Sequence, residues 1–186
     1  GPFIDKGCLI DSKVIGVQNS IDQFFYEDNG KKYMFWGSFR GIYATELTDN
    51  GLEIKKKTDG TPVLKKRICG NRFEGTNIYK RGEYYYLFAS IGTCCNGATS
   101  TYQTVVGRSK NVLGPYLDKT GRDMLYDYCE IIMSGNETWA GPGHNSILIQ
   151  DDVGTDWIIY HGYKKKEAEN GRYVLMDKLI WSNDGW

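Results

Sequence analysis

The sequence predicts an all-β protein built from repeated β-hairpins. Three stretches share one pattern, in which an apolar strand runs into a charged turn with glycine and an aromatic-rich strand follows: residues 24–38, 78–90 and 147–163. Glycine-containing turns between alternating strands are typical of hairpins. The chain also holds 14 Tyr, 7 Phe and 5 Trp, and aromatic side chains fit half-buried pleated surfaces.

Each hairpin has its own turn signal. The first, FFYEDNGKKYMFWGS, turns at Asn29-Gly30; the second, IYKRGEYYYLFAS, turns at Gly82; the third, ILIQDDVGTDWIIYHGY, turns around Gly154. Between the hairpins, Gly, Asn, Asp and Pro interrupt the chain before a helical pattern lasts three turns. Few helices are therefore expected.

The spacing of the hairpins predicts β-propeller blades. The matching aromatic residues Trp36, Phe88 and Tyr160 follow one another at intervals of roughly 50 to 70 residues, which is typical of blades with four strands each. The chain is long enough for about three such blades.

Composition excludes several classes of partner. The 23 basic and 23 acidic residues give zero formal net charge, so no bulk field attracts nucleic acid or anionic lipid. No apolar run is long enough to span a bilayer, and the N-terminus lacks the layout of a signal peptide, although a chain that begins within a protein would not show one. The five cysteines have no paired C-x-x-C spacing, so they predict neither a zinc site nor a complete disulfide framework.

A shorter repeat bears on domain organisation. The stretch 107–121 ends in GPYLDKTG, and residues 1–7 read GPFIDKG. The opening is thus similar to the tail of a blade whose earlier strands are absent. Because a propeller closes its ring to protect strand edges, we expect residues 1–186 to be a partial propeller domain that lacks its N-terminal blade or blades. The remaining blades would come from the same parent chain or from a second chain.

Two acidic residues directly precede hairpins. Asp22 precedes the first, and its apolar neighbours Ile21 and Phe24 would partly desolvate it and raise its pKa. Glu74 lies at the same point before the second, so it should face the same central cleft. Paired carboxylates from different blades are what glycoside hydrolysis requires. The alternatives are a turn or capping role for Asp22 and a solvated surface position for Glu74.

The two histidines and the adjacent cysteines are further candidates for site residues, but their sequence signals are less specific. His144, after Gly-Pro-Gly and before the third hairpin, is either a cation or sugar ligand at the axis or a core histidine. His161 lies within a strand and is expected to be structural. Adjacent cysteines rarely form a mutual disulfide because the ring is strained, and no histidine near Cys94 and Cys95 offers a base. We therefore expect these two to be buried packing residues.

At these residues the sequence resembles family 43 glycoside hydrolases, most closely the arabinan endo-1,5-α-L-arabinosidases. The resemblance covers nearly all of the chain in family order. It is carried by SIDQFFYEDNGKKYMFWGSF, FEGTNIYKRGEYYYLFAS, CCNGATSTYQTVVGRSKNVLGPYLDKTGRDM, GPGHNSILIQDD and LIWSNDGW.

The resemblance implies a five-bladed β-propeller that hydrolyses glycosidic bonds with inversion at the anomeric carbon. Three acidic residues take part: an Asp base, a Glu acid and a second Asp. By matching position, Glu74 resembles the general acid, and Asp22 resembles the aspartate that tunes the pKa of the acid and orients it. The base of the family lies in an H-D-P-like segment of the first blade, which nothing in this sequence matches. The catalytic base is thus expected outside this chain, and the chain alone is expected to be inactive.

The resemblance also implies ligand sites. His144 resembles the axial histidine beside a bound cation, usually calcium. Residues that resemble segments lining the sugar subsites are Ser38, Phe39, Cys94, Cys95 and Tyr102. The sequence departs from the family at Gln23, Arg40 and Thr76, which puts linkage preference in doubt more than fold.

The leading hypothesis is a hydrolase that cleaves α-1,5-arabinan and whose partner is arabinan or an arabino-oligosaccharide. The alternatives are an exo-acting α-L-arabinofuranosidase or β-xylosidase of the same fold, a carbohydrate-binding propeller without activity, and a purely structural piece. A secreted or periplasmic location is implied by the resemblance alone.

Overall fold

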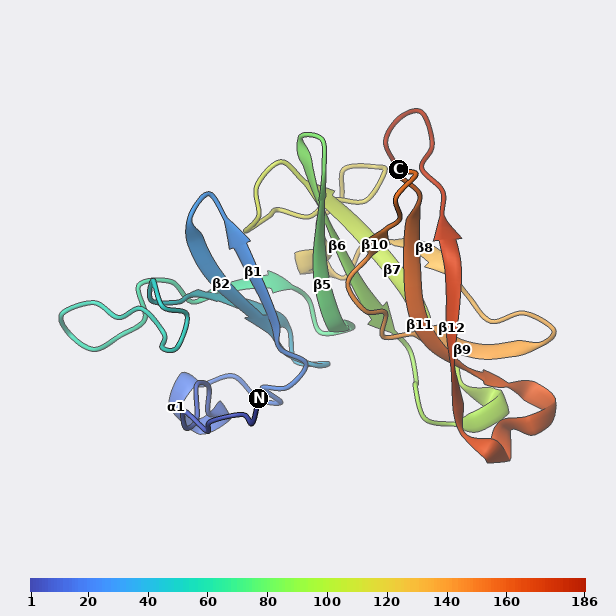
Figure 1. The fold of residues 1–186 in the computed structure, drawn as a ribbon, viewed down its shortest axis with the longest axis horizontal. Coiled ribbons are helices and arrows are strands. Elements are labelled where there is room, and N and C mark those ends of the chain that lie inside the picture. The colour runs from blue at the N-terminus through green and yellow to red at the C-terminus, as the bar shows by residue number, and fades with distance from the viewer.

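The computed structural model describes residues 1–186 and contains three antiparallel sheets of four strands each. The sheets follow one another along the chain and stand side by side (Figure 1). This arrangement confirms the prediction of an all-β chain that supplies about three propeller blades. Each of the three predicted hairpins is present.

The first sheet has its strands in sequence order: β1 (Phe24–Asp28), β2 (Lys31–Trp36), β3 (Ile42–Glu46) and β4 (Lys66–Cys69). The β1–β2 turn is Asn29-Gly30, and both residues have positive φ, at 49° and 75°. A two-residue hairpin turn requires this conformation, which Asn and Gly adopt with little strain.

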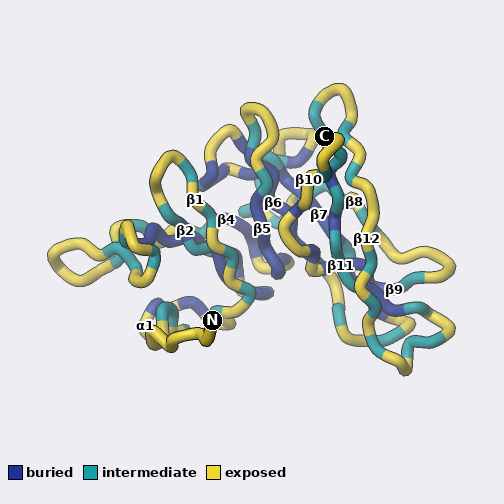
Figure 2. The backbone as a smooth tube through the Cα atoms, in the orientation of Figure 1, coloured by how far each residue is buried: buried dark blue, intermediate teal, exposed yellow.

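The second sheet lies in the middle and is the most buried (Figure 2). Its strands are β5 (Glu74–Arg81), β6 (Tyr84–Ile91), β7 (Gln103–Ser109) and β8 (Glu130–Met133). Strand β5 begins four residues before the predicted hairpin, so Glu74 is its first residue and pairs with Ser90 of β6. A bulge between Glu74 and Asn77 follows.

The third sheet has a broken inner strand. Its strands are β9 (Trp139–Gly143), β10 (Ile149–Gln150), β11 (Asp156–Lys164) and β12 (Arg172–Leu179). Strands β9 and β10 pair with different stretches of β11 along the same edge, and the break between them contains His144. Strand β12 pairs only with β11, so its other edge is open.

Helical segments are short. They are α1 (Ser12–Ile15) and the 3-10 turns η1 (Gly97–Thr99), η2 (Met124–Tyr126) and η3 (Lys165–Asn170). None of them is long and apolar enough to cross a membrane.

Apolar cores join neighbouring sheets. The largest core cluster has 16 buried residues from the first and second sheets, and a second cluster joins the second and third sheets around Tyr86, Phe88 and Ile158. Hydrogen bonds between sheets add to these contacts. The Tyr85 hydroxyl of the second sheet donates to Asp28 of the first at 2.5 Å, and the Tyr79 hydroxyl of the second sheet donates to Asp156 of the third at 2.6 Å. The three sheets therefore hold one another in fixed positions.

Candidate active site

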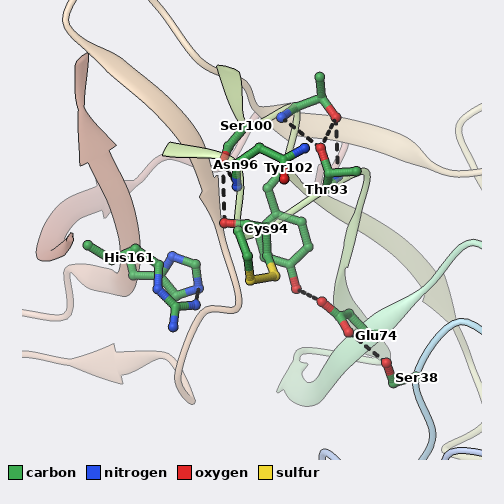
Figure 3. The surroundings of a disulfide bond; sticks show 11 residues. Ser38, Glu74, Thr93, Cys94, Asn96, Ser100, Tyr102 and His161 are labelled. Carbon is green, nitrogen blue, oxygen red and sulfur yellow. Dashed lines mark hydrogen bonds between the residues drawn. A yellow bond between two sulfur atoms is a disulfide. The ribbon is translucent and has the colours of Figure 1, made fainter. Parts of the chain in front are cut away.

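Glu74 is held by hydroxyl groups on both of its carboxylate oxygens. The Ser38 hydroxyl, just after β2, donates to Oε2 at 2.6 Å, and the Tyr102 hydroxyl, just before β7, donates to Oε1. Figure 3 shows Glu74 between these two side chains. Only 8% of Glu74 is exposed, so it is not a solvated surface carboxylate. Its orientation is fixed from the first sheet and from its own.

Asp22 lies beside Glu74. It precedes β1 with a left-handed φ of 56°, and its Oδ2 accepts a hydrogen bond from the backbone N–H of Gly75 at 3.3 Å. Burial raises the pKa of Asp22 and the charge of Glu74 raises it further, while His144 and the Gly75 N–H act in the opposite direction. Asp22 is thus bonded to a neighbouring sheet.

His144 reaches the same place from the third sheet. It occupies the break between β9 and β10 with a φ of 49°, and its backbone N–H donates to the Ser90 hydroxyl at 2.7 Å. Its ring lies against Gly75, where an added Cβ atom would approach the ring carbons to 3.0 Å. The structure therefore brings together Asp22, Glu74 and His144, one from each sheet.

Two residues predicted to line sugar subsites are buried next to Glu74. Ser38 is 2% exposed and Tyr102 is 0% exposed, so neither offers surface to a sugar. Their hydroxyls bond to Glu74 instead, a relation between sheets that the sequence does not reveal. Phe39 is half-buried, with a φ of 50°, and keeps surface for a ligand.

The prediction for Cys94 and Cys95 as unbonded, buried packing residues is wrong. They form a disulfide with each other (Figure 3), and Cys95 is exposed while Cys94 is half-buried. The pair lies in a tight loop in which Gly92 and Gly97, on either side, have positive φ. The Ser100 hydroxyl closes the loop through bonds with Asn96 and Cys94.

His161, which we expected to be structural, is also a neighbour of the site. Its ring stacks on Tyr102 with centroids 5.8 Å apart and planes 12° apart, and it lies 6.3 Å from the His144 ring. Burial, aided by Arg172 and His144, lowers the pKa of His161 to about 4. The one available signal was its position in the aromatic strand of the third hairpin.

This site defines a class of protein. A buried glutamic acid next to a second acid, on adjacent sheets of a propeller, is the type of site that hydrolyses glycosidic bonds with carboxyl groups. The model of the family "Glycosyl hydrolases family 43" matches residues 1–186. The chain belongs to this family.

Curated relatives agree with the family. The chain is 36% identical to an extracellular exo-α-(1→5)-L-arabinofuranosidase, ArbA, of Cellvibrio japonicus, over 98% of this chain and 55% of the relative. It is 34% identical to extracellular endo-α-(1→5)-L-arabinanase 1 of Bacillus subtilis, over 100% of this chain and 55% of the relative. The chain thus spans about half the length of these curated relatives.

Solved structures share the fold. An exo-1,5-α-L-arabinanase from a bovine ruminal metagenomic library matches with a TM-score of 0.78 and 35% identity, over 89% of this chain and 55% of that one. A Cellvibrio cellulosa α-L-arabinanase complexed with arabinohexaose matches with a TM-score of 0.74 and 34% identity, over 88% and 55% of the two chains.

Proposed function

We propose that this chain forms the acid-bearing part of a glycoside hydrolase that cleaves α-1,5-arabinan with inversion. Glu74 is the general acid in this proposal. The observation that carries it is the buried Glu74 carboxyl, fixed by Ser38 and Tyr102 and placed beside Asp22. The names of the relatives, which describe enzymes acting on arabinan, supply the substrate class.

In this mechanism Glu74 donates its proton to the departing glycosidic oxygen while water attacks the anomeric carbon from the opposite face. Inversion needs a second carboxylate roughly 6.5–9.5 Å from the acid to activate that water. Asp22 is unsuited to this task, because it accepts a bond from Gly75, the residue next to Glu74. We assign Asp22 to orienting Glu74 and place the base outside this chain.

Phe39 and the Cys94–Cys95 disulfide are the proposed sugar contacts. Cys95 is exposed, Phe39 is partly exposed, and the disulfide lies in the loop whose far end is Tyr102. Aromatic and sulfur surfaces are apolar, and they complement the less polar face of a furanose ring.

Calcium near His144 fits the residues of this chain only in part. Calcium takes six to eight oxygen ligands, but no three His, Cys, Asp or Glu side chains lie close enough together to hold a metal ion. The buried Oδ1 atoms of Asn77 and Asn145 lack hydrogen-bond partners and are oxygen donors of a suitable kind. We propose that a calcium ion binds here, with its remaining ligands supplied by water or by other blades. Calcium titration calorimetry on the full-length protein, with His144→Ala as control, tests it.

The remaining blades are the proposed partner of the open third sheet. The outer edge of β12 is unpaired, and Val174 and Ile180 are 80% and 85% exposed. A groove of about 570 Å³ lies between β8 and β12, and most of its lining is apolar. Exposed strand edges and apolar faces are normally covered, and the relatives are nearly twice as long as this chain.

Since both relatives are named extracellular, we propose a secreted or periplasmic protein.

Product analysis with the full-length protein on linear α-1,5-arabinan tests this function. Oligosaccharides as first products support endo action, whereas arabinose or one short product from the first minutes supports exo action, which the name of ArbA favours. Residues 1–186 alone should give no product. Binding of arabino-oligosaccharides without any hydrolysis by the full-length protein would show a carbohydrate-binding propeller and overturn the proposal.

A further inference from the structure

We propose that Tyr102 is a positioning residue for Glu74 and that the third sheet, through His161 and Gly143, holds Tyr102 in place. The inference rests on the proposed function and adds a role for the third sheet in orienting the acid. Tyr102 does not touch substrate in this account, because its side chain is fully buried.

The hydroxyl of Tyr102 is a permanent donor to Glu74. Burial raises the pKa of the phenol, and the hydrogen bond to Glu74 raises it further. The phenol therefore stays protonated over the range in which proteins fold. Its bond to Oε1 and the Ser38 bond to Oε2 leave the carboxyl group one orientation. A general acid works only when its proton points at the leaving oxygen, so this orientation matters for the reaction.

The ring of Tyr102 is clamped by two residues of the third sheet. The His161 ring stacks on it, with centroids 5.8 Å apart. Gly143, which pairs with His161 across β9 and β11, lies so close that an added Cβ atom would come within 2.3 Å of the Tyr102 ring. Only glycine leaves room for the ring at this place, and the ring cannot swing toward β9.

The polar groups around the ring complete the clamp. The Ser90 hydroxyl, on β6, accepts the backbone N–H of His144 at 2.7 Å, which ties the third sheet to the second beside Tyr102. The Nδ1 atom of His161 is buried without a hydrogen-bond partner, and Nε2 has only a long contact of 3.4 Å with the Arg172 guanidinium, so the ring acts mainly as a flat surface. A phenyl ring should therefore replace it.

The experiment compares variants of the full-length protein on two substrates. An arabino-oligosaccharide has a poor leaving group that needs the proton of the acid, whereas a 4-nitrophenyl arabino-oligosaccharide has a good one that needs little protonation. Tyr102→Phe keeps the ring and removes only the hydroxyl. We expect its kcat on the oligosaccharide to fall roughly 10- to 100-fold with KM unchanged, since the carboxylate that forms as Glu74 gives up its proton loses a hydrogen bond. Its kcat on the aryl substrate should change less than about threefold.

A second pair of variants tests the clamp. His161→Ala removes the stacked ring and should show the same loss of kcat, confined to the oligosaccharide, and His161→Phe should restore at least half of the wild-type rate. Equal losses on both substrates for Tyr102→Phe, or no rescue by His161→Phe at an unchanged Tm, overturn the inference. If Tyr102→Phe lowers Tm by more than a few degrees, its loss of activity could reflect instability, and the comparison of His161→Ala with His161→Phe then tests the inference. Glu74→Gln is the reference variant. If Glu74→Gln still hydrolyses the oligosaccharide, the proposed function fails. If Glu74→Gln loses this activity while Tyr102→Phe and His161→Ala keep it, only the positioning role fails.

Discussion

Gly75 lies between Asp22, Glu74 and His144. It follows Glu74 in the chain, its backbone N–H bonds to Asp22, and its α-carbon faces the His144 ring. Its φ of 62° is a conformation that other residues adopt only with strain. The absence of a side chain at this position allows three polar groups from three sheets to meet.

Replacement of Gly75 by alanine should therefore destabilise the protein in two ways. The positive φ costs about 1 kcal/mol, and the contact of 3.0 Å with the His144 ring adds about 1–2 kcal/mol of overpacking. Gly82→Ala is the matched control, because Gly82 has a φ of 58° and nothing within 4 Å of an added Cβ atom. Denaturant unfolding of both variants measures the difference, and equal losses would show that the His144 contact is unimportant.

The sequence predicted that Asp22, Glu74 and His144 lie close together, because this depends on local position. Asp22, Glu74 and His144 each stand next to a hairpin, and hairpins of one repeat align their ends. The contacts of Tyr102 and His161 could not be predicted, because they join strands of different sheets that are far apart in the chain. Their geometry depends on the packing of the second sheet against the third.

The disulfide loop was also not predictable from the sequence. Because disulfides between adjacent cysteines are rare, we predicted free thiols at Cys94 and Cys95. In the structure, the loop has glycine on both sides of this pair, and the two sulfur atoms are bonded. The hairpins, by contrast, were predictable, since turn residues and strand alternation act locally. The break between β9 and β10 was not, because both strands pair with β11 and the interruption follows from that partner.

Thiol counting tests the disulfide. The free cysteines are Cys8, which is exposed, Cys69, which is buried, and Cys129. Burial raises the pKa of the Cys69 and Cys129 thiols, so a thiol reagent at neutral pH should label Cys8 first. Denatured protein should show these three thiols before reduction and all five cysteines after it. Labelling of Cys94 and Cys95 without reductant would contradict the structure.

For the whole molecule, the three sheets form one arc with an open third sheet (Figure 1). The sequence predicted blades from the repeat spacing, while the number of blades in the ring came from the family resemblance. The exposed apolar residues on β12 and after it, such as Val174 and Ile180, follow from that open edge.

Binding of an apolar fluorescent dye tests whether further blades cover this surface. Residues 1–186 expressed alone should bind the dye, whereas the full-length protein should bind little, because its added blades exclude water from β12 and the groove beside β8. Val174→Lys should lower dye binding by the isolated residues and leave the full-length protein unchanged or less stable. Equal dye binding per molecule in the two proteins would contradict the account.

The rate of arabinan hydrolysis by the full-length Glu74→Gln variant tests the central claim most directly. The amide keeps the size of the side chain but has no proton to give, so kcat on linear α-1,5-arabinan should fall about 10²- to 10⁴-fold, while arabino-oligosaccharide binding by calorimetry persists. The control is Glu83→Gln, whose carboxylate pairs with Lys110 at the surface, with 66% of its side chain exposed, and which should keep the wild-type rate. A Glu74→Gln variant as fast as the Glu83→Gln control would contradict the assignment of Glu74 as the acid.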